Sequence, residues 1–159
     1  MPPEDVLLMM AQLGVAIAGF NGVATALGHG ARTGPRREVI GSVLITSAAA
    51  VIVWSVVPLV LLTAPVAPAV VWRFSSLGWC GVQLGLVVFR ERQGRRLQLV
   101  ATPLVRTMQG FVLMTAALQL WNGIALGEAW PHVVAVAQSL GVSITAFFML
   151  SHERDASES

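Results

Sequence analysis

The stretch VIGSVLITSAAAVIVWSVVPLVLLTAPVAPAVVWRFSSLGWCGVQLGLVVF, from Val39 to Phe89, decides the fold because its only charged residue is Arg73. The hydrocarbon core of a bilayer is about 30 Å thick and needs roughly 20 helical residues, so this stretch suits two crossings. The segment APVAP, at 64–68, lies near its middle, and paired prolines there favour a turn. The sequence therefore predicts two membrane-spanning helices, at about 39–63 and 68–89, joined by a hairpin.

Apolar runs on either side of this stretch predict three further spans. An uncharged run precedes the basic segment 29–38, and two more follow the basic segment 90–96; we expect both basic segments to be loops. Residues 97–105 are expected to lie along the interface, and 152–159 to form a short polar tail. The chain is therefore predicted to be one all-α integral membrane domain, a bundle of five transmembrane helices. The three further spans are expected at about 6–28, 107–126 and 133–150.

Composition excludes an ordinary soluble domain. The 159 residues are 55% hydrophobic and only 11% charged, with a mean hydropathy of +0.74, whereas soluble domains carry about 25% charged residues. A pI near 10 is compatible with nucleic-acid binding, but the arginines lie in short segments between apolar runs. The positive-inside rule explains them better, so membrane lipids and no nucleic acid are the expected partners.

Loop charge predicts the orientation of the bundle. Five alternating spans place both arginine-rich segments, 29–38 and 90–96, on one side, which should be the cytoplasm. The N-terminus is then outside and the C-terminus is cytoplasmic. We expect the first helix to be retained and not cleaved as a signal peptide, because its N-terminal flank holds Glu4 and Asp5 and the basic residues follow it.

Small residues form stripes on the first and third predicted helices. Three- and four-residue steps put the members of each stripe on one helix face, and small side chains let helices approach closely in lipid. The stripes are explained either by packing within the chain or by contact between subunits. The predicted helix-packing residues are Gly14, Ala18, Gly22, Gly78, Gly81 and Gly85.

Uncharged polar side chains recur at membrane depth, and three amides are candidates for a polar path: Asn21, Gln119 and Asn122. A primary amide in hydrocarbon must find a partner, so these side chains should face protein or water and not lipid. Hydrogen bonds between helices are the alternative role.

Two arginines lie in or near the apolar runs, Arg73 and Arg106. Both are close enough to helix ends to extend their charge to the interface. They are also candidates for contact with an anion or a lipid headgroup.

Motifs for enzyme chemistry are missing from the sequence. It has no metalloprotease motif, nucleophile elbow or phosphate-binding loop, and its single cysteine, Cys80, supplies no metal or disulfide framework. We therefore expect no enzymatic activity, no cofactor and no metal.

The segment Ala18-Gly19-Phe20-Asn21-Gly22 resembles the AGFxG stretch in the first helix of small, uncharacterised bacterial multi-span membrane proteins. Members often have Ser at the position of Asn21. The resemblance implies a bacterial inner-membrane protein and no particular activity.

The function expected from these features is a homo-oligomeric channel or pore-like protein, because the chain combines small-residue faces with many intramembrane amides. An accessory or scaffold subunit that binds another membrane protein is the first alternative, and a lipid-binding membrane protein is the second. A secondary transporter is disfavoured because no internal repeat pair is visible.

Overall fold

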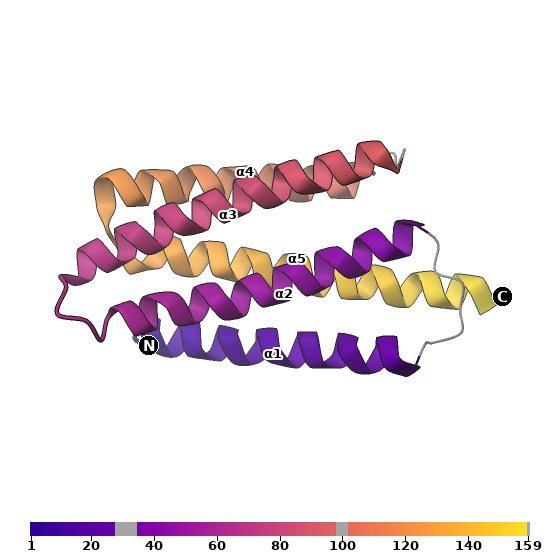
Figure 1. The fold of residues 1–159 in the computed structure, drawn as a ribbon, viewed down its shortest axis with the longest axis horizontal. Helices are drawn as coiled ribbons and strands as arrows, with labels where there is room; N and C mark the ends of the chain where they lie inside the picture. Colours follow the sequence, from indigo (N-terminus) through magenta and orange to yellow (C-terminus); the bar gives the residue numbers. More distant parts are fainter. Residues whose placement is uncertain (28–34, 98–101, 159) are drawn as a thin grey trace.

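The computed structural model describes the backbone of residues 1–27, 35–97 and 102–158, and the side chains of 1–20, 39–97 and 102–149. All regular secondary structure in this part of the chain is helical, as predicted, and it holds no strand. Figure 1 shows the long helices lying side by side. They are α1 (Pro3–Leu27), α2 (Pro35–Leu61), α3 (Pro68–Arg96), α4 (Pro103–Trp121) and α5 (Ala129–Glu158), with a short π-helix, η1 (Asn122–Leu126), continuing α4.

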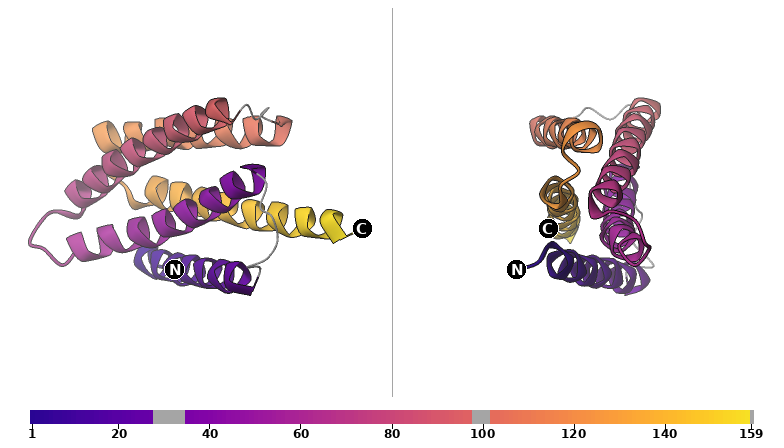
Figure 2. Two further views of the ribbon diagram at one scale, coloured as in Figure 1. Left: turned by 45° about the vertical axis from the view of Figure 1, so that its right-hand side comes forward. Right: turned by 90° about the vertical axis from the view of Figure 1, so that its left-hand side faces the viewer.

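The helices form an elongated bundle with α1 at one side. In the end-on view of Figure 2, α3 lies above α2 and α4 lies above α5, with α1 beneath α2 and α5. Helix α1 packs against α2 and α5, α2 packs against α5, and α3 packs mainly against α4 and η1. Four helices, α2 to α5, therefore surround the centre of the bundle.

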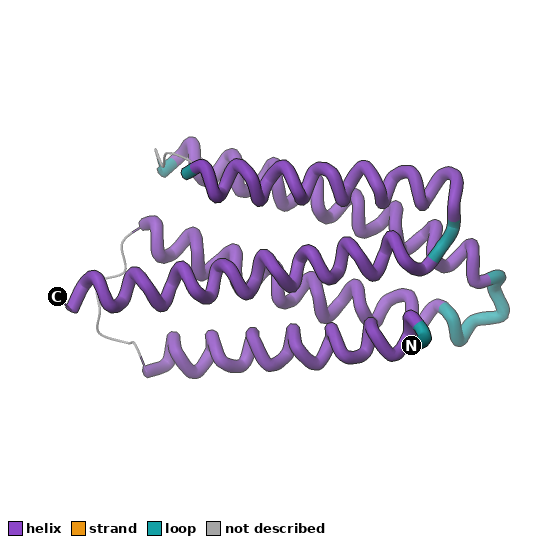
Figure 3. The backbone as a smooth tube through the Cα atoms, turned by 180° about the vertical axis from the view of Figure 1, so that it is seen from behind, coloured by secondary structure: helices purple, strands orange, loops and turns teal. Residues whose placement is uncertain are grey.

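The two ends of the bundle differ in charge. One end, the arginine-rich end, holds the last turns of α3 with Arg92, Arg95 and Arg96, together with the start of α2 and the end of α5 (Figure 3). The opposite end, the hairpin end, holds the turn at residues 62–67, the turn between η1 and α5, and the N-terminus. This is the arrangement that five alternating helices require.

Proline and capping residues explain where helices begin. Helices α3 and α4 start at Pro68 and Pro103, at a position where proline loses no helical hydrogen bond. Thr102 also caps α4, since its hydroxyl accepts a hydrogen bond of 3.4 Å from the Val105 N–H. The paired prolines of the hairpin thus separate α2 from α3, as predicted.

The two predicted basic loops are wrong in extent. Residues 90–96 continue α3, and residues 35–38 of the expected loop 29–38 belong to α2. Residues 152–158 of the predicted polar tail continue α5. Arg, Glu and Gln are strong helix formers, and Glu91 and Arg95, four residues apart, pair on the exposed face at 3.3 Å. The thickness of the hydrocarbon core limits the length of an apolar run, but the helix itself can continue beyond this run. The predicted interfacial segment 97–105 falls partly outside the described residues, and Pro103–Val105 belongs to α4.

Among the residues that the structure describes, three helical segments are long and apolar enough to span a membrane by length and composition: Pro3–Phe20, Val39–Leu61 and Ala129–Met149. The distribution of side chains agrees with a lipid surrounding. Leucine, phenylalanine and valine side chains are exposed along all five helices, whereas a set of polar side chains on α2 to α5 and η1, among them Ser55, Gln83, Gln119, Asn122 and His132, is buried. Gln12 on α1 is an exposed amide. A soluble monomer rarely exposes large apolar patches, so this surface is suited to hydrocarbon.

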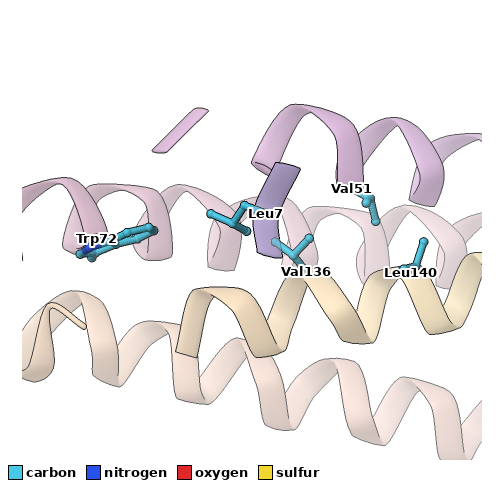
Figure 4. Packing of buried hydrophobic residues seen from close by; sticks show 5 residues of the cluster. All are labelled: Leu7, Val51, Trp72, Val136 and Leu140. Carbon is cyan, nitrogen blue, oxygen red and sulfur yellow. The ribbon is translucent and has the colours of Figure 1, made fainter. Parts of the chain in front are cut away.

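The hydrophobic core lies where α1, α2, α3 and α5 meet. Leu7, Val51 and Val136 are fully buried there, and Trp72 and Leu140 complete the cluster (Figure 4). Leu7 shares one face of α1 with Ala11 and Gly14, which are also buried. A Cβ on Gly14 would lie 3.3 Å from the Ala48 carbonyl oxygen, so the missing side chain allows close contact with α2.

Candidate functional site

Asn122 organises the turn between α4 and α5. Its side chain is fully buried and its Nδ2 donates to the Ser76 hydroxyl at 2.7 Å and to the Glu128 carbonyl at 2.9 Å. Its Oδ1 accepts from the Glu128 N–H at 3.0 Å. The chain reverses at Gly127, whose φ of 72° is a left-handed conformation that favours glycine. Asn122 therefore ties this turn to α3.

His132 completes a hydrogen bond that a proline leaves open. Pro58 lies inside α2 and has no N–H, so the carbonyl of Trp54, four residues earlier, loses its helical donor. The Nε2 atom of His132 lies 2.8 Å from this carbonyl oxygen. Because a carbonyl only accepts, Nε2 carries the proton. This bond links α5 to α2, while Gln119 links α4 to α5 by donating to the Pro131 carbonyl at 2.6 Å.

The centre of the bundle contains a narrow cavity of about 20 Å³, which we call the central cavity. A space of this size accommodates one water-sized molecule. It lies between α2, α3, α4 and α5, from the middle of the bundle toward the arginine-rich end. Its walls are formed by Ser47, Ala50, Trp79, Gln83, Leu86, Arg90, Val112, Gln138, Ser139 and Val142.

A polar network crosses the middle of this cavity. Gln83, which is 2% exposed, donates from Nε2 to the Thr115 hydroxyl at 3.2 Å and to Gln138 Oε1 at 3.3 Å. Thr115 also lies 3.3 Å from the same oxygen. The network thus joins α3, α4 and α5, but it leaves Gln83 Oε1 buried without a partner. Such a group is costly unless something satisfies it.

Arg90 lies at the end of the central cavity nearest the arginine-rich end. Its Nη2 donates to the Ser47 hydroxyl at 2.9 Å, which connects α3 to α2, and its buried Nε has no partner. Arg90 is half-buried, and no carboxylate among the described residues pairs with it. Burial of an unpaired cation is unusual in structural packing.

Two tryptophans lie toward the hairpin end from the central cavity: Trp79 lines the cavity, and Trp54 packs against Trp79. Trp54 and Trp79 have ring centroids 5.5 Å apart, and each lies one helical turn toward the hairpin end from a cavity residue, Ala50 or Gln83. Trp79 is 1% exposed, and its Nε1–H has no partner. The ring of Trp54 also covers Gly78, where a Cβ would lie 2.5 Å from it.

The predicted path residues are not brought together in the central cavity. Gln119 and Asn122 are 0% exposed, which confirms that they face protein and not lipid, but their bonds tie helices together at the hairpin end. The side chain of Asn21 lies outside the described residues. A role of these amides in a path therefore stays a prediction.

The small-residue stripes divide into packed and exposed parts. Gly14 contacts α2 and Gly78 contacts Trp54, whereas Gly81 and Gly85 are exposed and a Cβ on either would meet nothing within 4 Å. Packing within the chain thus does not explain these two glycines. Ala18 is half-buried, and the surroundings of Gly22 lie outside the described residues.

Arg73 and Arg106 are both exposed. Arg73 lies near the hairpin end and its Nη2 donates to the Ala125 carbonyl at 3.4 Å, where the end of η1 leaves carbonyl groups open. Arg106 lies in the first turn of α4 at the arginine-rich end. Their positions suit contact with lipid headgroups, which stays a prediction.

The sequence interpretation missed Arg90 because it placed this residue in a loop. The helical spacing contains the signal: Trp79, Gln83, Leu86 and Arg90 follow steps of four, three and four residues and share one face of α3. If the predicted helix had been extended by one turn beyond the apolar run, Arg90 would have fallen on the same helix face as Gln83 and Leu86.

A second, larger space is a groove of about 470 Å³ on the outside of α2, lined by Ile52, Val53, Val56, Val57, Val60 and Leu61. All six side chains are aliphatic, so the groove provides no polar chemistry and is suited to acyl chains. The central cavity is therefore the candidate functional site.

Comparison of the chain with protein-family models, curated proteins and solved structures found no match.

Proposed function

We propose that the protein is a small channel or pore-like protein of the bacterial inner membrane, and that its polar path runs through the central cavity. The observation that carries this proposal is a cavity between four helices, lined by both polar and apolar side chains, in a bundle whose outer surface is apolar. Three residues that line it, Trp79, Gln83 and Arg90, each have a buried polar atom without a hydrogen-bond partner. Unpartnered buried atoms also occur elsewhere, on Ser55, Ser75, Gln119 and His132, so the support for a path is that three such groups line one cavity, where a passing species could bind them.

The size of the central cavity limits what the path carries. A volume of about 20 Å³ admits one water-sized species at a time, so the path is single-file. The rings of Trp54 and Trp79, tilted at 45° to one another with centroids 5.5 Å apart, obstruct the path toward the hairpin end. The structure is then a closed state, and opening requires these rings to separate.

We further propose that all five helices span the membrane, with the arginine-rich end in the cytoplasm. Helix α3 has 29 residues, and α4 with η1 runs from Pro103 to Leu126, about 36 Å at 1.5 Å per residue. Either length exceeds the roughly 30 Å of the hydrocarbon core. The charge difference between the ends follows the positive-inside rule. A reporter fused to the C-terminus is expected to be cytoplasmic, and an external reporter would contradict this orientation.

Cysteine accessibility tests the path directly. In a Cys80→Ser background, Ser139→Cys introduces a thiol into the cavity wall, and Ala137→Cys introduces one on the exposed side of the same helix. In liposomes, the wild-type protein should conduct small ions. A charged, membrane-impermeant thiol reagent should block flux through the Ser139→Cys variant and leave the Ala137→Cys variant unaffected. Absence of flux in the wild type, or equal block of both variants, would overturn the proposed path.

The exposed glycines favour a second candidate, an accessory or scaffold subunit. Gly81 and Gly85 are four residues apart on the outside of α3 and have open space around them, the spacing at which helices associate closely in lipid. The same face would serve a homo-oligomeric channel. Size-exclusion chromatography with light scattering distinguishes the two: a homo-oligomer with flux supports the channel, and a monomer without flux supports the accessory subunit.

A further inference from the structure

The central cavity is lined by charge of one sign. Among the described residues that line it, Arg90 is the only ionisable group, and no carboxylate is present. The ion pair formed by Arg95 and Glu91 lies on the exposed face of α3 and does not involve Arg90. Within the described residues, the Arg90 guanidinium has the neutral Ser47 hydroxyl as its hydrogen-bond partner and no carboxylate. When a cavity with walls of low dielectric constant is lined by charge of one sign, the electric field of that charge is concentrated in the cavity.

The free hydrogen-bonding groups of the cavity are mainly donors. Arg90 Nε–H and Trp79 Nε1–H are both buried without partners. Their residues lie eleven positions apart on α3, about 16 Å along the helix axis, so the two groups do not bind a single ion together. Between them lies the Gln83 side chain, and the Ser139 hydroxyl is on the facing wall. Donors at successive positions suit an anion that moves along the cavity.

Gln83 contributes the one unpartnered acceptor, its Oε1. The oxygen and nitrogen of a glutamine amide have nearly the same shape, and the hydrogen-bond network decides their assignment. If Gln83 and Gln138 both rotate by half a turn about the last side-chain torsion, Gln138 Nε2 donates to Gln83 Oε1 in place of the present bond of 3.3 Å. Gln83 Nε2 then faces the cavity. The pair can therefore present a donor without losing its mutual bond.

We propose that the central cavity binds a small monovalent anion, with Arg90 as the charged group that attracts it. The part of this inference that concerns conduction rests on the proposed channel function: the path should carry small anions and reject cations. Arginine at a constriction is a means by which pores select anions. Chloride is a suitable probe because it is small and monovalent and accepts hydrogen bonds without donating any.

Binding is tested without any flux measurement. The purified full-length protein in a non-ionic detergent is unfolded thermally in increasing sodium chloride or sodium gluconate at equal ionic strength, since gluconate is too large for a cavity of about 20 Å³. A ligand that binds the folded state raises the midpoint in a saturable way. We expect such a rise with chloride only. Equal midpoints in the two salts would overturn the proposed site.

Substitution of arginines locates the site. Arg90→Gln should weaken chloride binding at least tenfold, whereas Arg90→Lys, which retains the positive charge, should keep a saturable chloride effect. Arg106→Gln is the matched control, because it removes the same charge from an exposed side chain outside the cavity. Retention of the full chloride effect in Arg90→Gln, or its loss in Arg106→Gln, would overturn the assignment. If Arg90→Gln does not fold, two comparisons still test the site: the midpoints of the wild type in the two salts, and the chloride effect in Arg90→Lys relative to the wild type.

Flux separates this inference from the proposed function. In liposomes, the wild type should carry chloride in preference to sodium, and Arg90→Gln should lose this preference. Flux with sodium preferred to chloride keeps the channel and overturns the anion site. Saturable stabilisation by chloride in a protein that conducts nothing keeps the anion site and overturns the channel.

Discussion

Gly78→Ala and Gly81→Ala are the same substitution, three residues apart on α3, and we expect opposite effects on stability. A Cβ on Gly78 would lie 2.5 Å from Trp54 Cη2 and 3.0 Å from its Cζ3, whereas a Cβ on Gly81 would meet nothing within 4 Å. The indole of Trp54 cannot simply rotate away, because it packs against Trp79 at a centroid distance of 5.5 Å. Gly78→Ala therefore forces a displacement of both rings.

The magnitude follows from two terms. Alanine is a better helix former than glycine by about 0.8–1 kcal/mol, a gain that applies to both positions and cancels in their comparison. Overpacking of a filled site costs about 1–3 kcal/mol and applies only to Gly78. Gly81→Ala should thus stabilise the protein by at most about 1 kcal/mol. Gly78→Ala should be less stable than Gly81→Ala by about 1–3 kcal/mol.

Reversible unfolding by sodium dodecyl sulfate in mixed micelles measures this difference as a change in the free energy of unfolding. Gly85→Ala is a second control, since this position is also open. The reasoning is refuted if Gly78→Ala equals or exceeds Gly81→Ala in stability. If Gly81→Ala leaves the monomer stable but breaks an oligomer, the exposed glycines form a subunit contact.

Three further substitutions test the polar and small-residue contacts by the same unfolding measurement. Asn122→Ala removes three hydrogen bonds and should cost about 2–4 kcal/mol at roughly 1 kcal/mol per bond. A double-mutant cycle with Ser76→Ala should show a coupling of about 0.6–1.7 kcal/mol. A coupling of zero would contradict the hydrogen bond between Asn122 and Ser76. His132→Phe should cost about 1–3 kcal/mol, and less in a Pro58→Ala background, where the restored N–H bonds the open carbonyl; equal costs in both backgrounds would contradict that explanation. Gly14→Leu should cost more than 1 kcal/mol, because even a Cβ would lie 3.0 Å from the nearest side chain; an unchanged free energy of unfolding would show that this contact is loose.

The helical class, the hairpin and most of the apolar helix segments follow from the order of the residues alone. The reason is local: a helix that crosses hydrocarbon must be apolar for about 20 residues, and paired prolines interrupt it wherever they lie. Burial of Gln119 and Asn122 was predictable for a similar reason, since an unpaired amide in hydrocarbon is costly on any helix. These conclusions need no knowledge of which helices are neighbours.

Which polar residues meet depends on how the helices pack in three dimensions. Gln83 and Gln138 are 55 positions apart, and Ser47 and Arg90 are 43 positions apart; helix periodicity assigns each residue to a face but does not say which faces oppose. The same limit applies to the glycines, because Gly78 and Gly81 look alike in the sequence and differ only in whether Trp54 lies above them. The central cavity, and the unpaired charge at its end, exist because four helices converge there, and convergence is a property of the packed bundle and not of any one helix.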